Sequence, residues 1–294
     1  MTFPVIDAHQ HVWDPRRAHY AWLPNEAAEL DRPIYFDELR HELRNVGVDF
    51  TVQVQSGDVP EDTALMIESA EMHPEVAGIV GYAPVDRPDA CASTIDQWRG
   101  NPLMVGVRTL IHNQPDPDWL LRPDVGEGLS LLAQAGLTFD IVSVTPRHLE
   151  HVPILAARHP NLSFVIDHLS KPPVGLADRE PWWTRIAAAA DHTNVYGKVS
   201  GLYSATRTPG AWSTAQIEPY FERALDLFGA ERLMYGGDWP ISIPEGGYTR
   251  VWGGLWPLFA QLSELDREWI LGRTAATFYG LSHERLGLDS EAEA

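Results

Sequence analysis

Eight apolar runs recur along the chain and read as buried strands. They cover residues 4–12, 48–55, 76–85, 104–112, 137–144, 162–169, 194–203 and 232–239. The runs are rich in Val and Ile and alternate with segments of helical spacing, which is typical of a parallel sheet covered by helices on both faces. The strands of this sheet are expected to include residues 5–12, 48–55, 104–111 and 232–238.

Helical spacing separates most of the runs. In residues 36–47, apolar side chains recur every three or four positions, with Asp37 as a candidate N-cap and Gly47 as a stop. Similar segments cover residues 61–74, 128–136, 149–160, 182–192, 217–229 and 266–280. Eight β/α units in 294 residues match a closed (β/α)8 TIM barrel better than an open doubly wound sheet. No G-x-G-x-x-G motif follows the first run and no low-complexity linker divides the chain, so residues 1–294 are predicted to form one domain.

Polar side chains interrupt the apolar runs near their carboxyl ends, where (β/α)8 barrels place their active sites. These residues are His9, His11, Gln55, Arg108, His112, His168, Lys198 and Asp238. The longest connections also follow strand ends, and they cover residues 13–35, 112–127 and 239–254. Long loops at that end predict a pocket over the barrel mouth, with His9, His11 and Asp238 inside it.

Two histidines on alternate positions of the first run are candidate metal ligands. His9 and His11 share one face of a strand, so both imidazoles can point at a single ion. His168 and Asp238 can complete its coordination, and these donors suit zinc or another divalent first-row ion. The alternative is a buried pair without a metal, hydrogen-bonded to Asp7 and to loop backbone.

The charge balance narrows the range of partners. Asp and Glu outnumber Lys and Arg by 41 to 22, and the net charge of −19 argues against nucleic acid and anionic membrane surfaces. No segment is apolar enough to span a bilayer. The single cysteine, Cys91, excludes an internal disulfide and fits a reducing compartment, so a cytoplasmic location is expected. A homo-oligomer is compatible with the sequence.

Five motifs, in chain order, resemble the amidohydrolase-related family of barrel hydrolases. They are "IDAHQHVWDP", "GVRTLIHNQPDPDWLLRPD", "FVIDHLSKPP", "VYGKVSGL" and "RLMYGGDWP". The resemblance is narrower to the branch that contains sugar-acid lactonases and 2-pyrone-4,6-dicarboxylate hydrolase. It extends from the first run to "TAATFYGL" near the end, and so covers essentially the whole chain.

The resemblance implies a ligand set and limits the number of metal ions. The implied ligands are His9, His11, His168 and Asp238, and Trp22 is placed at the pocket rim. Some members of the branch work with a divalent ion and others without one. Two-metal members of the larger superfamily carry a bridging modified lysine or a histidine at the end of the fifth strand, and "LTFDIVSV" offers neither. The expectation is one divalent ion, zinc first, or none.

Four of these residues are candidates for catalysis. Asp238 can take a proton from water and return it to the leaving oxygen, or it serves only a turn or cap. Arg108 offers a planar fork to a carbonyl or carboxylate, or it pairs with Asp140 or another acid. Lys198 can stabilise an oxyanion, or it pairs with Asp238 or Asp140. His168, with the other histidines, can polarise the substrate carbonyl.

Four further residues are candidates for binding substrate. Gln55, His112 and Asp140 can hydrogen-bond hydroxyl groups, although packing is the alternative for each. The Trp22 ring can close over a sugar-like ring. These side chains favour a small-molecule substrate.

Three functions are compatible with these residues. The first is hydrolysis of a small lactone, most directly a sugar-acid lactone, with a pyrone or muconolactone as a variant. The second is metal-dependent decarboxylation of an unsaturated dicarboxylate, and the third is sugar-acid binding without catalysis. The second requires cations for two carboxylates, and only Arg108, Lys171, Lys198 and Arg207 lie near the predicted mouth. A lactone with at most one negative charge fits better.

Overall fold

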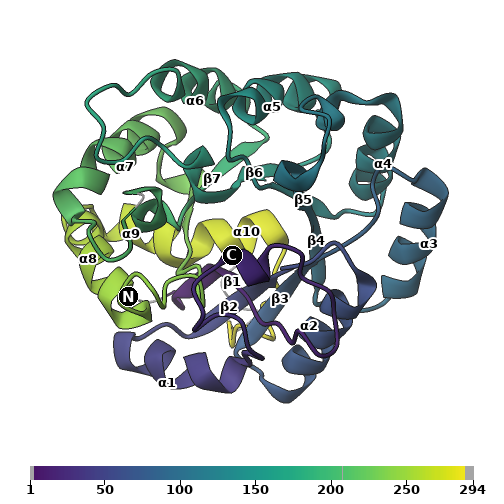
Figure 1. Cartoon of the computed structure of the whole chain (residues 1–294), viewed down its shortest axis with the longest axis horizontal. Helices are drawn as coiled ribbons and strands as arrows, with labels where there is room; N and C mark the ends of the chain where they lie inside the picture. The colour runs from purple at the N-terminus through teal and green to yellow at the C-terminus, as the bar shows by residue number, and fades with distance from the viewer. Residues whose placement is uncertain (1–2, 207, 289–294) are drawn as a thin grey trace.

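The computed structural model describes residues 3–206 and 208–288 and contains the predicted barrel. Parallel strands pair in chain order from β1 to β8, with helices around them (Figure 1). The strands are β1 (Ile6–Gln10), β2 (Phe50–Val54), β3 (Val76–Gly81), β4 (Met104–Thr109), β5 (Thr138–Ile141), β6 (Phe164–Ile166), β7 (Val195–Val199) and β8 (Leu233–Tyr235). The (β/α)8 prediction is confirmed.

The strands are shorter than predicted at their carboxyl ends. β1 ends at Gln10 and β8 at Tyr235, before the predicted limits at residues 12 and 238. β2 and β4 are likewise shorter than predicted. The chain leaves the sheet at these points to form the barrel mouth, so His11 and Asp238 lie in the segments that follow the paired strands.

Helices surround the barrel. They are α1 (Phe36–Val46), α2 (Pro60–Met72), α3 (Pro88–Trp98), α4 (Pro123–Gln134), α5 (Pro146–Arg158), α6 (Trp182–Ala190), α7 (Thr214–Phe228), α8 (Tyr248–Ala260), α9 (Glu264–Glu268) and α10 (Thr274–Tyr279). A π-helical segment, Trp269–Arg273, joins α9 to α10. The helical segment predicted over residues 266–280 is confirmed, with a π-helical turn inside it.

Three other local predictions need correction. The expected loop at 112–127 contains the start of α4, and the expected loop at 239–254 contains the start of α8. Gly253 and Gly254 are weak helix formers, which hid α8 in the sequence. The N-cap of α1 is Tyr35, so Asp37 lies in the first turn instead, while the left-handed Gly47 ends the helix as predicted.

The last helix closes one end of the barrel. α10, in yellow, crosses the barrel in Figure 1. Its Phe278 and Tyr279 belong to a buried apolar cluster with Ile6, Ala77 and Val105, which lie toward the amino ends of their strands. Because α10 fills this end, the carboxyl ends of the strands form the open end.

A buried carboxylate joins β1 to the segment after β8. Asp7 is fully buried and accepts hydrogen bonds from the backbone N–H groups of His9 and Gly237, both at 2.9 Å. Its other oxygen accepts from the Tyr248 hydroxyl of α8 at 2.8 Å. Burial raises the pKa of Asp7 to about 6, against the effect of these three donors. Asp7 thus connects the first strand, the segment after β8 and α8.

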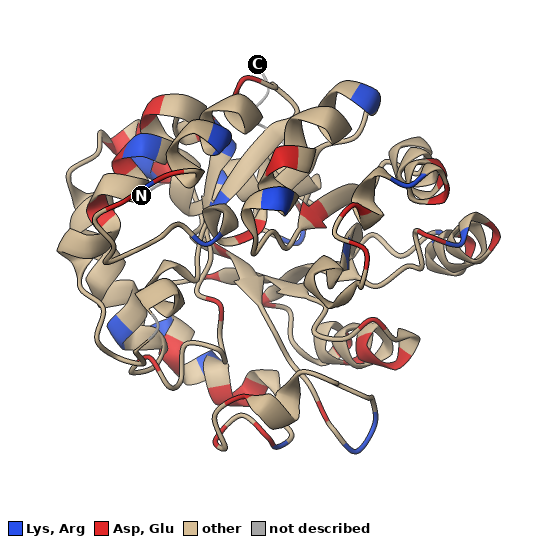
Figure 2. Cartoon of the chain, turned by 45° about the horizontal axis from the view of Figure 1, so that its top comes forward, with Lys and Arg blue, Asp and Glu red and all other residues tan. Residues whose placement is uncertain are grey.

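The outer surface carries the acidic excess. Figure 2 shows acidic positions on many of the helices around the barrel, with fewer basic positions among them. Within residues 3–206 and 208–288, no helix combines the length and the apolar character needed to cross a bilayer.

Tyr248→Phe tests the role of Asp7 in joining β1 to α8 and to the segment after β8. The substitution leaves a buried carboxylate oxygen without its donor, so the free energy of unfolding should fall by about 1–3 kcal/mol in urea denaturation. Tyr196→Phe is the matched control, because the Tyr196 hydroxyl makes no hydrogen bond in the described part of the chain, and it should change stability by less than about 0.5 kcal/mol. Equal losses in the two variants would contradict the assignment.

Candidate active site

A pocket of about 570 Å³ opens at the carboxyl ends of the strands. Six of the predicted site residues line it: His11, Trp22, Arg108, His112, His168 and Asp238. The other four predicted residues, His9, Gln55, Asp140 and Lys198, have no exposed surface and lie around or beneath it. The residues predicted from seven of the eight strands therefore form one region.

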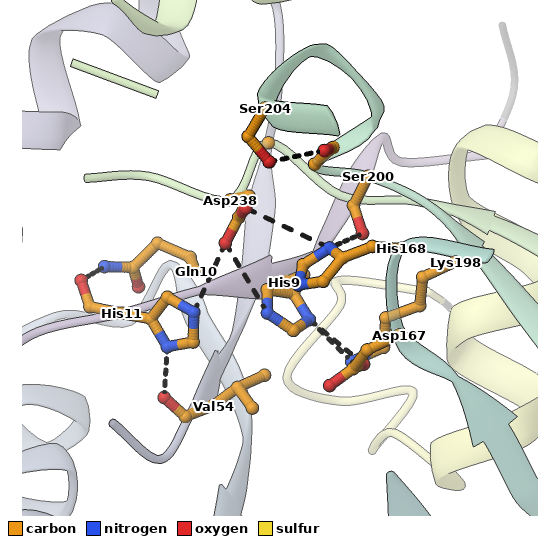
Figure 3. A network of polar contacts seen from close by, with 12 residues as sticks. His9, Gln10, His11, Val54, Asp167, His168, Lys198, Ser200, Ser204 and Asp238 are labelled. Carbon is orange, nitrogen blue, oxygen red and sulfur yellow. Dashed lines mark hydrogen bonds and ion pairs between the residues drawn. The ribbon is translucent and has the colours of Figure 1, made fainter. Parts of the chain in front are cut away.

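Three histidines surround the Asp238 carboxylate (Figure 3). Its Oδ1 lies 3.4 Å from His11 Nε2 and 3.7 Å from His9 Nε2, and its Oδ2 lies 3.9 Å from His168 Nδ1. His9 and His11 come from β1 and its extension, His168 follows β6, and Asp238 follows β8. The expectation that His9, His11 and Asp238 share one pocket region agrees with these distances.

Left-handed backbone places two of these side chains. Asp238 has φ +50°, and four consecutive residues from His168 to Lys171 have φ between +45° and +62°. For residues with a Cβ this conformation costs about 1–2 kcal/mol each. Gly201 leaves room for the result, since a Cβ there would lie 2.5 Å from His168 Nδ1 and 2.9 Å from Asp238 Oδ2. The fold thus holds strained residues at the site.

The hydrogen bond of His11 fixes its tautomer. His11 Nδ1 lies 2.7 Å from the carbonyl oxygen of Val54, and a carbonyl can only accept, so Nδ1 carries the hydrogen. The lone pair of Nε2 then faces Asp238 Oδ1. Such an arrangement is favourable only when a proton or a cation lies between the two atoms.

Burial keeps the histidines neutral. Loss of solvent lowers the pKa of His168 to about 4 and also lowers the pKa of His11. It lowers the pKa of His9 well below its usual value, with a further contribution from the Lys198 charge. Neutral imidazoles can ligate a metal or accept a hydrogen bond.

Asp238 is ionised in the same surroundings. Burial alone would raise its pKa, but His168, His11 and His9 together hold the pKa of the carboxyl below its usual range. An ionised carboxylate can accept a proton from water.

Lys198 lies beneath the histidines and outside the pocket. Its Nζ lies 2.5 Å from Asp140 Oδ2, 3.1 Å from Asp167 Oδ1 and 3.0 Å from His9 Nδ1. The Tyr279 hydroxyl donates to Asp140 at 2.9 Å. These partners surround Lys198 and Asp140 completely, so neither side chain is placed to touch a ligand in the pocket.

Arg108 is held from two sides within the site. Its Nη1 donates to Asp167 Oδ2 at 3.0 Å and its Nη2 to the carbonyl oxygen of Gln55. The Gln55 amide donates in return to the carbonyl oxygen of Arg108 and to Asp58, both at 3.1 Å. The ion pair of Arg108 is thus with Asp167 and not with Asp140, and its buried Nε has no partner among the described residues.

Two residues of the site escaped the sequence analysis. Asp167 connects Arg108, Lys198 and His9, and a carboxylate beside His168 in an apolar run was the signal for it. Tyr279 reaches the network from α10. Nothing in its local sequence distinguishes it from an ordinary core tyrosine.

Asp62 anchors the loops over the mouth. It is fully buried at the start of α2 and accepts from the Tyr20 hydroxyl at 2.7 Å and from the Ser56 N–H at 2.8 Å. Trp22 Nε1 in turn donates to the Ser56 carbonyl oxygen at 2.7 Å. This chain of contacts holds Trp22 at the pocket wall.

The donor set fits a divalent metal ion. One ligand atom from each of His9, His168 and Asp238 lies within 4.8 Å of the others, and all three residues are buried. His11 lies outside this group although its Nε2 lone pair faces Asp238. Neutral imidazole nitrogens and a carboxylate are the ligands that first-row divalent ions take.

Residues 6–281 match the family model described as amidohydrolase. The chain belongs to the amidohydrolase family. This amidohydrolase is 36% identical to an L-fucono-1,5-lactonase of Burkholderia ambifaria, over 95% of this chain and 96% of that protein. It is 31% identical to an L-fucono-1,5-lactonase of Burkholderia multivorans, over 94% and 96%.

A solved structure supports the same assignment. An amidohydrolase from Burkholderia multivorans with bound zinc superimposes on this amidohydrolase with a TM-score of 0.86. The two are 29% identical, and the match covers 95% of this chain and all of the other. The family and the donor set together support a metal in the site, without defining which ion or how many.

Asp62→Asn tests, through the pH dependence of stability, whether the buried Asp62 carboxyl holds the loops over the barrel mouth. Burial raises the pKa of Asp62 to about 6, above the 3.8 of a free aspartate. The folded state therefore binds this proton more tightly, and the stability it contributes is complete below pH ~4 and lost as the pH rises through ~6. Asparagine cannot titrate, so wild type should lose about 2 kcal/mol relative to the variant between pH 4.5 and 7.5 in urea unfolding. A constant difference would contradict the raised pKa.

Proposed function

We propose that this amidohydrolase opens a neutral sugar-acid lactone by water attack, with L-fucono-1,5-lactone as the first substrate to test. The observation that carries the proposal is the ionised Asp238 carboxylate, surrounded by three neutral histidines, in the wall of a pocket of about 570 Å³. The lactonase names of two relatives that span nearly the whole chain supply the substrate class.

Asp238 acts as the base and then as the acid. It removes a proton from a water molecule, and the hydroxide attacks the carbonyl carbon of the lactone. The electron pair of the carbonyl moves onto its oxygen, on the side of the pocket lined by His11 and His168. When the tetrahedral intermediate collapses, Asp238 returns its proton to the departing ring oxygen.

Arg108 supplies a hydrogen-bond donor to the oxyanion. Its two terminal nitrogens are held by Asp167 and Gln55, so the guanidinium cannot swing away. The guanidinium carries five N–H donors, and those not directed at Asp167, His9 and Gln55 remain for the oxyanion at the pocket wall. A donor fixed before the reaction stabilises developing charge without reorganisation.

A single divalent ion, zinc first, is proposed for the histidine and aspartate cluster. His9, His168 and Asp238 would hold it, with His11 beside them. Such an ion would polarise the lactone carbonyl as a Lewis acid.

The charges in the pocket favour a lactone over a dicarboxylate. Arg108 and Lys171 are the cations among its described lining residues, and Arg108 is already paired with Asp167. A dicarboxylate would meet Asp238 and Glu245 in the same pocket without enough positive charge to balance its own. Decarboxylation of such an acid is therefore not favoured.

Turnover of a lactone panel tests the function. A pH indicator should report hydrolysis of L-fucono-1,5-lactone, with slower turnover of unsubstituted δ-valerolactone, which offers no hydroxyl groups to bind. Carbon dioxide release from an unsaturated dicarboxylate should not be detected. Carbon dioxide release without lactone hydrolysis would reverse the assignment.

Asp238→Asn keeps the shape of the side chain and removes the base. Turnover of the lactone should fall by about 10²–10⁴-fold, while KM changes far less. Asp96→Asn is the control, because Asp96 is an exposed carboxylate on α3 that pairs with the exposed Arg99. Near-normal turnover in the Asp238 variant would exclude it as the base and transfer that role to a histidine.

Metal content tests the proposed ion. Elemental analysis of protein purified without chelator should find no more than about one equivalent of zinc. His168→Asn should lower that content, while the exposed His19 gives a control in His19→Asn. A second tightly bound equivalent, or an unchanged content in the His168 variant, would refute the single site.

A further inference from the structure

Lysine is confined to the active-site region of this chain. Of the 22 basic residues counted as Lys and Arg, 20 are Arg and two are Lys, at positions 171 and 198. Lys198 lies beneath the histidine cluster, and Lys171 lines the pocket. The two side chains differ chemically, since Lys carries a compact ammonium with three donors and Arg a planar fork.

The surroundings of Lys198 explain why a lysine, and not an arginine, stands at this position. Its Nζ forms ion pairs with the carboxylates of Asp140 and Asp167 and lies 3.0 Å from His9 Nδ1, so a compact ammonium fills the space between these three groups. Lys198 is therefore a support for the histidine and, with no exposed surface, is out of reach of a substrate in the pocket.

Lys171 has no such partners. Its side chain makes no hydrogen bond or ion pair in the described part of the chain, and the residue is exposed at the pocket wall. Desolvation and then the charges of Arg108 and Lys171 lower the pKa of His112, so the Lys171 charge acts across the pocket. Among the described lining residues, Lys171 is the cation that remains unpaired.

The backbone presents Lys171 on the same turn as His168. The left-handed turn from His168 to Lys171 brings residues three apart to one side, and both line the pocket. Trp182 Nε1 donates to the carbonyl oxygen of Leu169 at 2.6 Å, and the hydroxyls of Ser143 and Ser170 lie 2.6 Å apart. Strained backbone held by such contacts is a basis for inferring function.

We propose that Lys171 binds the negative charge that lactone opening creates, first on the tetrahedral oxyanion and then on the carboxylate of the product. This proposal rests on the proposed lactonase function. Water adds one oxygen to C1, the C1–O ring bond breaks, one water proton reaches the ring oxygen through Asp238, and the other leaves the new carboxylic acid to solvent. The substrate is neutral and the product is an anion.

The change of charge predicts a specific kinetic effect. A neutral lactone gives the ammonium no charge to pair with, so Lys171 should contribute little to substrate binding. The interaction strengthens only as negative charge develops, and interactions of that kind raise kcat rather than lower KM. The same contact should hold the product and make it an inhibitor.

Lys171→Met removes the charge and retains much of the side-chain length. We expect kcat on L-fucono-1,5-lactone to fall by about tenfold or more, with KM within about twofold. The affinity for L-fuconate, measured by calorimetry, should fall by about tenfold. Added salt should weaken L-fuconate binding to wild type but not to the variant.

Arg44→Met is the control for the loss of one positive charge. Arg44 is an exposed side chain in the last turn of α1, away from the pocket, and its removal should leave kcat, KM and L-fuconate affinity unchanged. Unchanged L-fuconate affinity and kcat in Lys171→Met would overturn the proposal. So would a raised KM at constant kcat, which indicates a contact with a hydroxyl group of the substrate.

The two proposals can fail separately. If wild type hydrolyses no lactone, the proposed function is wrong. If wild type is active and the Lys171 variant behaves like wild type in both kcat and L-fuconate binding, only the role of Lys171 is wrong.

Discussion

The junction between β1 and the segment after β8 is the interaction on which the site depends. The Asp238 N–H donates to the His9 carbonyl oxygen, and the His11 N–H donates to that of Trp239, both at 2.8 Å. These hydrogen bonds close the barrel and, in the same step, bring the carboxylate of Asp238 to the two histidines. Barrel closure and assembly of the catalytic group are therefore one structural event.

Close packing at this junction limits which residues can occupy the positions before Asp238. A Cβ at Gly236 would lie 2.6 Å from His9 Cβ, and one at Gly237 would lie 2.2 Å from the ring of Tyr248. Both glycines are required by close approach of neighbouring side chains, since a larger residue would separate β8 from β1. The segment "GGDWP" thus serves closure and chemistry together.

The sequence predicted the architecture and much of the site because both follow from local pattern. Eight apolar runs define the strands, and polar residues at their carboxyl ends, such as Arg108 and Asp238, must meet at one mouth. Which charged side chains pair with each other was harder to predict from the sequence. Lys198 could pair with either of two acids or with a substrate, and only the register of β5, β6 and β7 sets it between Asp140 and Asp167.

The contribution of α10 was invisible to local pattern, and it has a consequence for synthesis of the chain. Tyr279 supplies a hydrogen bond to Asp140 beneath the site, while His9 and His11 come from the first strand. The first strand and α10 therefore meet in one charge network. Until α10 has been synthesised, Asp140 lacks the Tyr279 donor and the amino ends of the strands lack their apolar cover, so the site cannot reach its final form before synthesis has passed residue 279.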